Sequence, residues 1–263
     1  MSQSEAAGPA EGLPPALRRA WGARAPRGAR GRRASLDIDT IVMRAVELAD
    51  AGGVSALSLV RLADSLNVTP NALYRYLDSR EELDILLREY ALADPPSAAP
   101  HDDWQAAARD WAHRLRARYL AHPWLADLRL TVPITPNALG WLEALLARLE
   151  GSPLGTAETI RAATLLDGYI RAQFISQRDV RAWAEDPSSE DGDLTGQVLP
   201  FIDARGYDRV AALFREGVYR EPTKEIHDRD FEYGLDRILL GLSFAEGSQD
   251  HSPATSRGAR PRG

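Results

Sequence analysis

The chain has 263 residues and a formal net charge of −6; 44% of its residues are hydrophobic and 27% are charged. It has no cysteine, which excludes disulfides and thiolate metal sites, and no run of about 18 apolar residues, which excludes a membrane-spanning helix. The first residues lack the apolar core of a signal peptide, so we expect a cytoplasmic protein with one large domain or two modest ones.

The first 35 residues form a basic segment with little apolar pattern. They hold seven arginines against Glu5 and Glu11, a net charge of +5, and are rich in glycine, alanine and proline. Such a composition buries too little apolar surface to fold alone, so we predict a disordered basic arm over residues 1–35. The arm is either a solvating tail or a flexible segment that lies along an anionic polymer.

Helical periodicity begins at Leu36, and no run alternates long enough to predict a strand. Ser58 suits the cap of a second helix, and Ser79 with Glu82 forms a capping box at the start of a fourth. The apolar spacing therefore predicts four consecutive helices, at about residues 39–51, 59–66, 69–76 and 79–90.

Residues 94–102 are rich in proline and indicate a linker. Beyond it the apolar spacing predicts a short helix opened by His122 and longer helices at about 102–121, 136–149, 156–184, 194–204, 207–217 and 229–245. The sequence thus predicts an all-α fold. It has an N-terminal three-helix helix-turn-helix head over residues 36–93, a C-terminal helical-bundle body over 101–246 and a disordered tail over 247–263.

Within the head, two short helices joined by Leu66, Asn67 and Val68 are typical of a helix-turn-helix. Asn67 tolerates the left-handed backbone that such a turn needs. Thr69 suits the cap of the next helix and Pro70 its first position, where a missing N–H costs nothing.

This next helix is too short to bury its large side chains, which are Asn71, Tyr74, Arg75 and Tyr76. In the major groove asparagine pairs with adenine and arginine with guanine, while tyrosine hydroxyls and helix N-termini reach phosphates. The residues favour a surface that contacts DNA. The alternative is a head whose tyrosines simply pack against the body.

The stretches "IVMRAVELADAGGVSALSL" and "ALYRYLDSREEL" closely resemble the DNA-binding head of the tetracycline-repressor family, over about residues 38–92. The resemblance implies binding of double-stranded DNA, with Arg80 at a position where the family often has lysine. By position it implies phosphate contacts from Ser58, Tyr74 and Arg80, and a base-facing helix start at Thr69, Pro70, Asn71, Arg75 and Tyr76. The chain departs from the family at Asn67, where glycine is usual, and at Leu59 and Val60, which are apolar.

The body resembles the C-terminal ligand-binding domain of the same family, through "HPWLADLRLTVPITPNALGWLEALLARLEG" and "FEYGLDRILLGL". This resemblance implies a homodimer with an effector cavity in each body. Aromatic and polar residues on apolar helices are the candidate ligand-binding residues: Trp104, Trp111, Trp124, Asn137, Trp141, Thr164, Tyr169 and Gln173. The alternative is that they are core, solvent-facing or dimer-interface residues.

The longest and the last helices present apolar stripes that we expect to form the dimer interface. These stripes consist of Leu166, Ile170, Phe174, Phe231, Leu235, Ile238 and Leu242.

We find no catalytic motif, no histidine pair with metal-ligand spacing and no cofactor loop, so we expect no enzyme, metal or cofactor. The interpretation is a ligand-responsive transcriptional regulator, a repressor that binds a palindromic operator as a dimer and is released by a small apolar effector. Two alternatives remain: an all-helical small-molecule carrier or enzyme, and a regulator without an effector.

Overall fold

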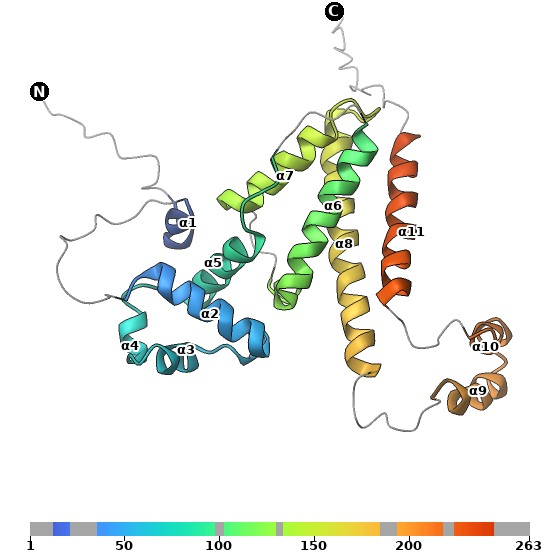
Figure 1. Ribbon diagram of the computed structural model, residues 1–263, viewed down its shortest axis with the longest axis horizontal. Helices are drawn as coiled ribbons and strands as arrows, with labels where there is room; N and C mark the ends of the chain where they lie inside the picture. Colours follow the sequence, from blue (N-terminus) through green and yellow to red (C-terminus); the bar gives the residue numbers. More distant parts are fainter. Residues whose placement is uncertain are drawn as a thin grey trace, which may run out of the picture.

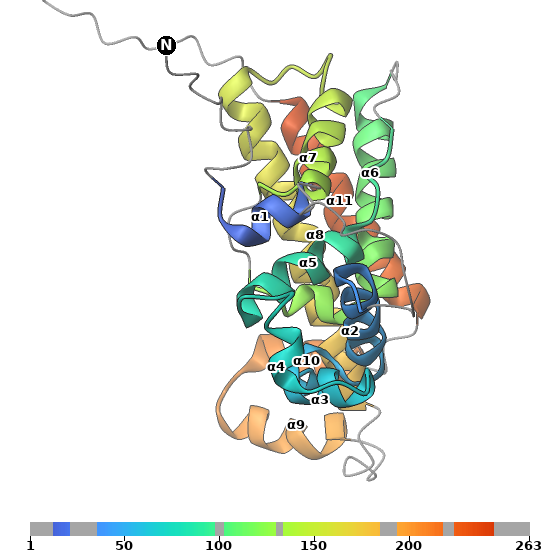
Figure 2. The ribbon, with the colours of Figure 1, turned by 90° about the vertical axis from the view of Figure 1, so that its left-hand side faces the viewer.

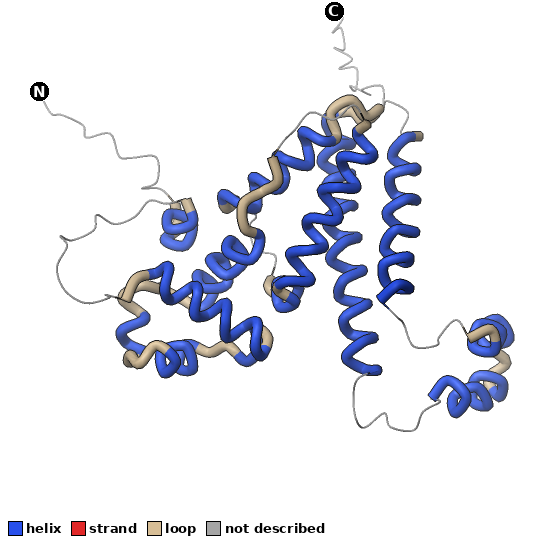
Figure 3. Tube along the Cα trace, viewed as in Figure 1, coloured by secondary structure: helices blue, strands red, loops and turns tan. Residues whose placement is uncertain are grey.

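A computed structural model of the chain describes residues 13–21, 36–97, 103–129, 134–184, 194–217 and 224–244. Every regular element in these ranges is a helix, as Figure 3 shows, so the predicted all-α fold is confirmed. The tail predicted over 247–263, and the arm apart from residues 13–21, lie outside the described residues.

The head is built from α2 (Ile38–Gly52), the 3-10 turn η1 (Val54–Ala56), α3 (Leu59–Ser65), α4 (Pro70–Leu73) and α5 (Arg80–Leu92). These elements enclose a small apolar core, with α2 packed against both α3 and α5. The core side chains are almost fully buried and include Ile41, Ala45, Leu62, Leu73, Leu77, Leu83 and Leu87.

Side-chain caps set the starts of the head helices. Asp37 accepts a hydrogen bond from the Thr40 amide at 2.8 Å, and Ser58 accepts one from the Arg61 amide at 3.1 Å. At α5 the predicted cap forms, since Ser79 accepts from the Glu82 amide at 3.1 Å, but the Glu82 carboxylate accepts from the Asp78 amide at 2.6 Å, one residue before the cap. The helix starts therefore follow directly from these polar residues.

The body consists of α6 (Trp104–Ala121), η2 (Pro123–Ala126), α7 (Pro136–Arg148), α8 (Thr156–Ala184) and α11 (Lys224–Ser243). α8 is the longest helix described, and it packs against α6, α7 and α11. Figures 1 and 2 show α6, α7 and α11 gathered around α8, with the head at one end of the body.

Two short helices, α9 (Leu194–Ala204) and α10 (Asp208–Arg215), form a hairpin that stands apart from the bundle in Figure 1. They pack against each other through buried Ile202 and Ala211, and the turn between them uses Gly206 with φ 69°. Phe201 is 73% exposed, so the hairpin presents apolar surface to its surroundings.

The structure differs from the sequence prediction in the N-terminal arm, where residues 15–20 form a helix, α1 (Pro15–Ala20). α1 packs against α5 and buries Leu17, and Arg19 forms an ion pair with the buried carboxylate of Glu82 at 3.1 Å. The indole N–H of Trp21 donates to the carbonyl of Ile134 at 2.9 Å. The prediction of disorder is wrong here, since tertiary contacts supply what composition alone could not.

One close contact fixes α11 against α8. The Tyr169 hydroxyl donates to the Phe231 carbonyl at 2.8 Å, and the two rings stack with centroids 5.8 Å apart. The Tyr169 ring lies over Gly234, where a Cβ atom would overlap it, whereas a Cβ at Gly241 would meet no atom within 4 Å. Packing therefore requires a glycine at position 234 but not at position 241.

We predict that Gly234→Ala lowers the free energy of unfolding by about 1–3 kcal/mol, because the added methyl group forces the Tyr169 ring out of position. Gly241→Ala is the matched control and should raise stability by up to about 1 kcal/mol through helix propensity. Urea unfolding followed by circular dichroism measures both. Equal effects of the two substitutions would show that the Tyr169 contact does not hold α11.

Candidate functional site

The exposed end of the head is formed by α4 and the turn that precedes it. Asn67 adopts φ 55°, the left-handed conformation predicted for the turn. Leu73 and Leu77 anchor α4 in the core and are each 1% exposed. With this anchor in place, the opposite side of α4 faces outward.

The outward residues are those that the sequence singled out. Asn71, Tyr74 and Arg75 are exposed, and Thr69 is exposed beside them, while Tyr76 is half-buried. Asn71 lies within α4, and Tyr74 and Arg75 lie in the turn that directly follows its end at Leu73. The structure therefore leaves an amide, a phenol and a guanidinium exposed within five consecutive residues.

Pro70, Thr69 and Ser58 set the local backbone. Pro70 occupies the first turn of α4, as predicted, but the Thr69 side chain makes no cap hydrogen bond, contrary to its predicted role as a cap. Ser58 is exposed at the start of α3, and its oxygen accepts the Arg61 amide. A hydroxyl in this position still has its own hydrogen to donate outward.

Arg80 differs from its predicted role as a phosphate contact. Its guanidinium donates to the carbonyl of Leu57 and, at 3.1 Å, to the carbonyl of Val54, while its Nε donates to Asp84 at 2.8 Å. These carbonyls belong to the segment that links α2 to α3. The carbonyl groups of this short turn have few partners of their own, and Arg80 supplies hydrogen-bond donors to two of them. Arg80 thereby ties the segment to α5.

A partly open cavity of about 260 Å³ lies between α5, α6, α7 and α8. Most of its lining is apolar, and two tryptophans contribute to it: the Trp111 indole donates to the Trp141 carbonyl at 2.9 Å, and the Trp141 indole donates to the Leu92 carbonyl at 3.0 Å. With both N–H groups satisfied, the indole rings offer apolar surface. The lining comprises Arg88, Leu92, Trp111, Leu115, Ala138, Trp141, Leu142, Leu145, Ile160, Ala163, Thr164 and Asp167.

Trp111, Trp141 and Thr164 are the predicted ligand-binding residues that line this cavity. The other five lie elsewhere. Trp124 and Asn137 are hydrogen-bonded to the head helices, as described below, and Trp104 packs at the edge of the core.

Tyr169 and Gln173 also lie outside the cavity. Tyr169 bonds the α11 backbone, and Gln173 hydrogen-bonds to Tyr169. Their placement corrects the sequence prediction, because these polar groups serve contacts between helices.

Two charged residues of the cavity, Arg88 and Asp167, were missed by sequence reasoning. The available signal was a charge inside an apolar run, "ILLREYAL" for the arginine and "TLLDGYI" for the acid. Burial raises the pKa of the Asp167 carboxyl above its ordinary value, and the positive charges of Arg88 and Arg171 oppose this rise.

The predicted dimer interface is wrong in its assignment of faces. Leu166, Ile170 and Leu235 are 0% exposed within one chain, because the stripes of α8 and α11 pack into the core of the body. Phe174 and Phe231 are buried in the same core, and Ile238 and Leu242 pack against it. A second chain cannot reach the five buried side chains without unfolding the body, whereas the half-buried Ile238 and Leu242 remain predictions.

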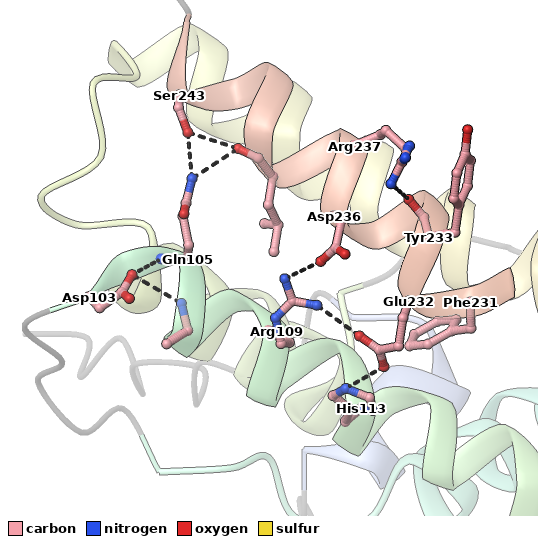
Figure 4. A network of polar contacts seen from close by, with 12 residues as sticks. Asp103, Gln105, Arg109, His113, Phe231, Glu232, Tyr233, Asp236, Arg237 and Ser243 are labelled. Atoms are coloured by element: carbon pink, nitrogen blue, oxygen red, sulfur yellow. Dashed lines mark hydrogen bonds and ion pairs between the residues drawn. The ribbon is translucent and has the colours of Figure 1, made fainter. Parts of the chain in front are cut away.

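Polar contacts hold α11 to α6, as Figure 4 shows. Arg109 bridges Glu232 at 2.8 Å and Asp236 at 2.5 Å, and His113 contacts the other oxygen of Glu232 at 2.9 Å. Near the end of α11, the Gln105 amide donates to Ser243. One side of α11 is therefore committed to α6 and another to α8, which leaves its remaining side outward.

Two sets of hydrogen bonds join the head to the body. At the end of α2, the Asp50 carboxylate accepts from the Trp124 indole at 2.6 Å and contacts His122 Nδ1 at 2.9 Å. At the end of α5, the Asn137 side-chain amide donates to the Glu89 carbonyl at 2.9 Å. Both α2 and α5 of the head are therefore hydrogen-bonded to the body.

Within the described residues, no helix is long and apolar enough to cross a membrane, and no cluster of acids and histidines is arranged to hold a metal ion. A helix-turn-helix head joined through one helix to a helical body with a mostly apolar cavity defines a transcriptional regulator with a small-molecule site.

Comparison with known proteins identifies the family. The family model described as "Tetracyclin repressor-like, C-terminal domain" matches residues 95–245. The HTH-type transcriptional repressor DrrR1 of Streptomyces coeruleorubidus is 30% identical over 222 residues, which cover 82% of this chain and 80% of that protein. The chain belongs to the tetracycline-repressor family, whose members are transcriptional regulators and not enzymes.

Other relatives agree with this assignment. The tetracycline repressor protein class E of Escherichia coli is 28% identical over 223 residues, covering 84% of this chain and 97% of that protein. Crystal structures of ActR from Streptomyces coelicolor superpose with a TM-score of 0.65 at 27% identity. The complex with (S)-DNPA covers 81% of this chain and 100% of ActR, and the complex with actinorhodin covers 80% and 96%.

We predict that Arg80→Ala lowers the free energy of unfolding by about 2 kcal/mol, because two carbonyl groups of the α2–α3 link lose a charged donor. Arg75→Ala is the matched control: this exposed side chain should change stability by less than about 0.5 kcal/mol. The midpoints of urea unfolding compare the two variants. If Arg80→Ala unfolds like the wild type, the link does not depend on this arginine.

Proposed function

We propose that this protein is a repressor that binds a palindromic DNA operator as a dimer and that a small, largely apolar molecule in the cavity releases it. The observation that carries the proposal is the exposed group Asn71, Tyr74 and Arg75 on a head that shares α5 with the cavity. The names of the relatives support it, since DrrR1 is named a repressor and ActR is solved with (S)-DNPA and with actinorhodin.

The chemistry of the exposed group suits the major groove. Asn71 and Arg75 can each make a pair of hydrogen bonds to the edge of a purine, and these contacts carry sequence specificity. Tyr74 and Ser58 are placed to donate to phosphates, which fixes the position of the head on the duplex. Arg80 is left out of this proposal because each of its three nitrogens already donates a hydrogen bond within the head.

A dimer through the outward sides of α8 and α11 fits the exposed residues. On α11, Ile226, Tyr233 and Leu240 recur every seven residues and are 39%, 60% and 56% exposed. On α8, Leu165 is exposed beside the small residue Gly168. Two such helices from each chain would form a four-helix interface with a two-fold axis.

Release by an effector follows from α5. Its first residue, Arg80, holds the head, while its later residues Arg88 and Leu92 line the cavity. A ligand that prefers one position of α5 would change the spacing of the two heads on DNA. Its effect on DNA affinity cannot exceed its own preference between the two positions, typically about 1–3 kcal/mol.

Selection of bound sequences from a random DNA pool tests the proposal. We expect a palindrome with half-sites about 34 Å apart and an affinity that falls steeply with salt. A protein without salt-dependent DNA binding would be a carrier instead. Binding that no cavity ligand weakens would indicate a regulator without an effector.

We predict that Arg75→Ala weakens operator binding by about 1–3 kcal/mol and relaxes specificity at one base position, because a base contact is lost. Arg205→Ala, an exposed arginine of the α9–α10 hairpin, is the control and should leave binding unchanged. Fluorescence anisotropy with single-base operator variants measures both. An unchanged sequence preference in Arg75→Ala would remove this residue from the interface.

We predict that Tyr233→Glu combined with Leu240→Glu gives monomers, since the new charges lie unpaired in the proposed interface. Tyr207→Glu with Leu213→Glu changes equally exposed residues of the hairpin and should leave the dimer intact. Sedimentation velocity decides between the outcomes. A dimer as tight as the wild type in the first variant would place the interface elsewhere.

A further inference from the structure

The cavity has one charged wall in an otherwise apolar enclosure. Among the described residues that line it, only Arg88 of α5 and Asp167 of α8 are ionisable, and no hydrogen bond or ion pair joins these two side chains. The remaining lining is mostly aliphatic and aromatic. A ligand that fills this space therefore meets two charges of opposite sign that do not satisfy each other.

The charges around the Asp167 carboxyl are mainly positive. Arg88, which lines the cavity, and Arg171, which lies outside its lining, both act electrostatically on this carboxyl. Arg171 is held by the carbonyls of Ala126 and Leu128, which bind its N–H groups but leave its charge uncompensated. In surroundings of low dielectric constant a surplus charge attracts an opposite one strongly.

Arg88 itself is incompletely satisfied. Its Nε atom is buried and has no hydrogen-bond acceptor. A buried polar group without a partner costs free energy, more so when it is charged. The Nε atom itself is closed off, so a ligand in the cavity would meet the terminal nitrogens of the Arg88 guanidinium. Burial also raises the pKa of Asp167, which reduces the negative charge available to balance the arginines.

We propose that the effector is an aromatic carboxylic acid: its ring system occupies the apolar space beside Trp111 and Trp141, and its carboxylate binds Arg88. This inference rests on the proposed function and names the chemical class of its ligand. The two indoles supply flat apolar surface, because their N–H groups are already bonded to carbonyls. The carboxylate supplies the planar acceptor that a guanidinium binds most strongly.

The test uses two probes of the same shape, β-naphthoate and the neutral β-naphthamide, and full-length protein. Calorimetry should show that the wild type binds the acid at least about tenfold more tightly than the amide. Arg88→Gln should weaken binding of the acid by about tenfold and leave the amide unchanged. Asp167→Asn should tighten binding of the acid, because it removes the one opposing charge, and again leave the amide unchanged.

The opposite directions of the two variants separate charge recognition from damage to the cavity, which would weaken both probes in both variants. Arg181→Gln, on the exposed far end of α8, is the control and should change neither affinity. Equal affinity for acid and amide, failure of both to bind, or loss of the acid in Asp167→Asn would overturn the inference. Operator binding by the ligand-free protein is measured separately, so its absence would refute the proposed function without bearing on the preference for an acid.

Discussion

The packing of α5 between the head and the body, within one continuous hydrophobic core, is the constraint on which the structure depends. Leu83 and Leu87 face the core of the head, while the Leu92 carbonyl accepts from Trp141 in the body. A helix of 13 residues spans about 20 Å and transmits displacement as a rigid rod. The same helix begins shortly after α4 and lines the cavity with Arg88 and Leu92, so a displacement of α5 would affect both places.

Much of the head could be predicted because its signals are local. Gly52 and Gly53 end the first helix, and Ser58 and Ser79 cap later ones through bonds that span only three residues. The faces of α8 and α11 could not be assigned in the same way. Periodicity shows that the stripe containing Leu166 is buried, but it carries no information on whether the covering surface belongs to the same chain or to another.

The residues that line the cavity could not be predicted from the sequence either. Trp111 and Trp124 are both buried aromatic residues, yet only the first lines an empty space, because that space arises from the mutual placement of four helices. The same holds for charged residues, as two arginines eight residues apart on α5 illustrate. Arg80 donates to two carbonyl groups of the α2–α3 link and to Asp84, whereas the buried Nε of Arg88 has no acceptor. Residue type predicted neither role.

The hydrogen bonds at Asp50 have a mechanical consequence. α5 attaches the head to the body at one place, and Asp50, through Trp124 and His122, attaches it at a second. Because the bonds at Asp50 hold the end of α2, a displacement of α5 that leaves them intact would turn the head instead of shifting it unrotated, and the direction in which α4 faces would change with it.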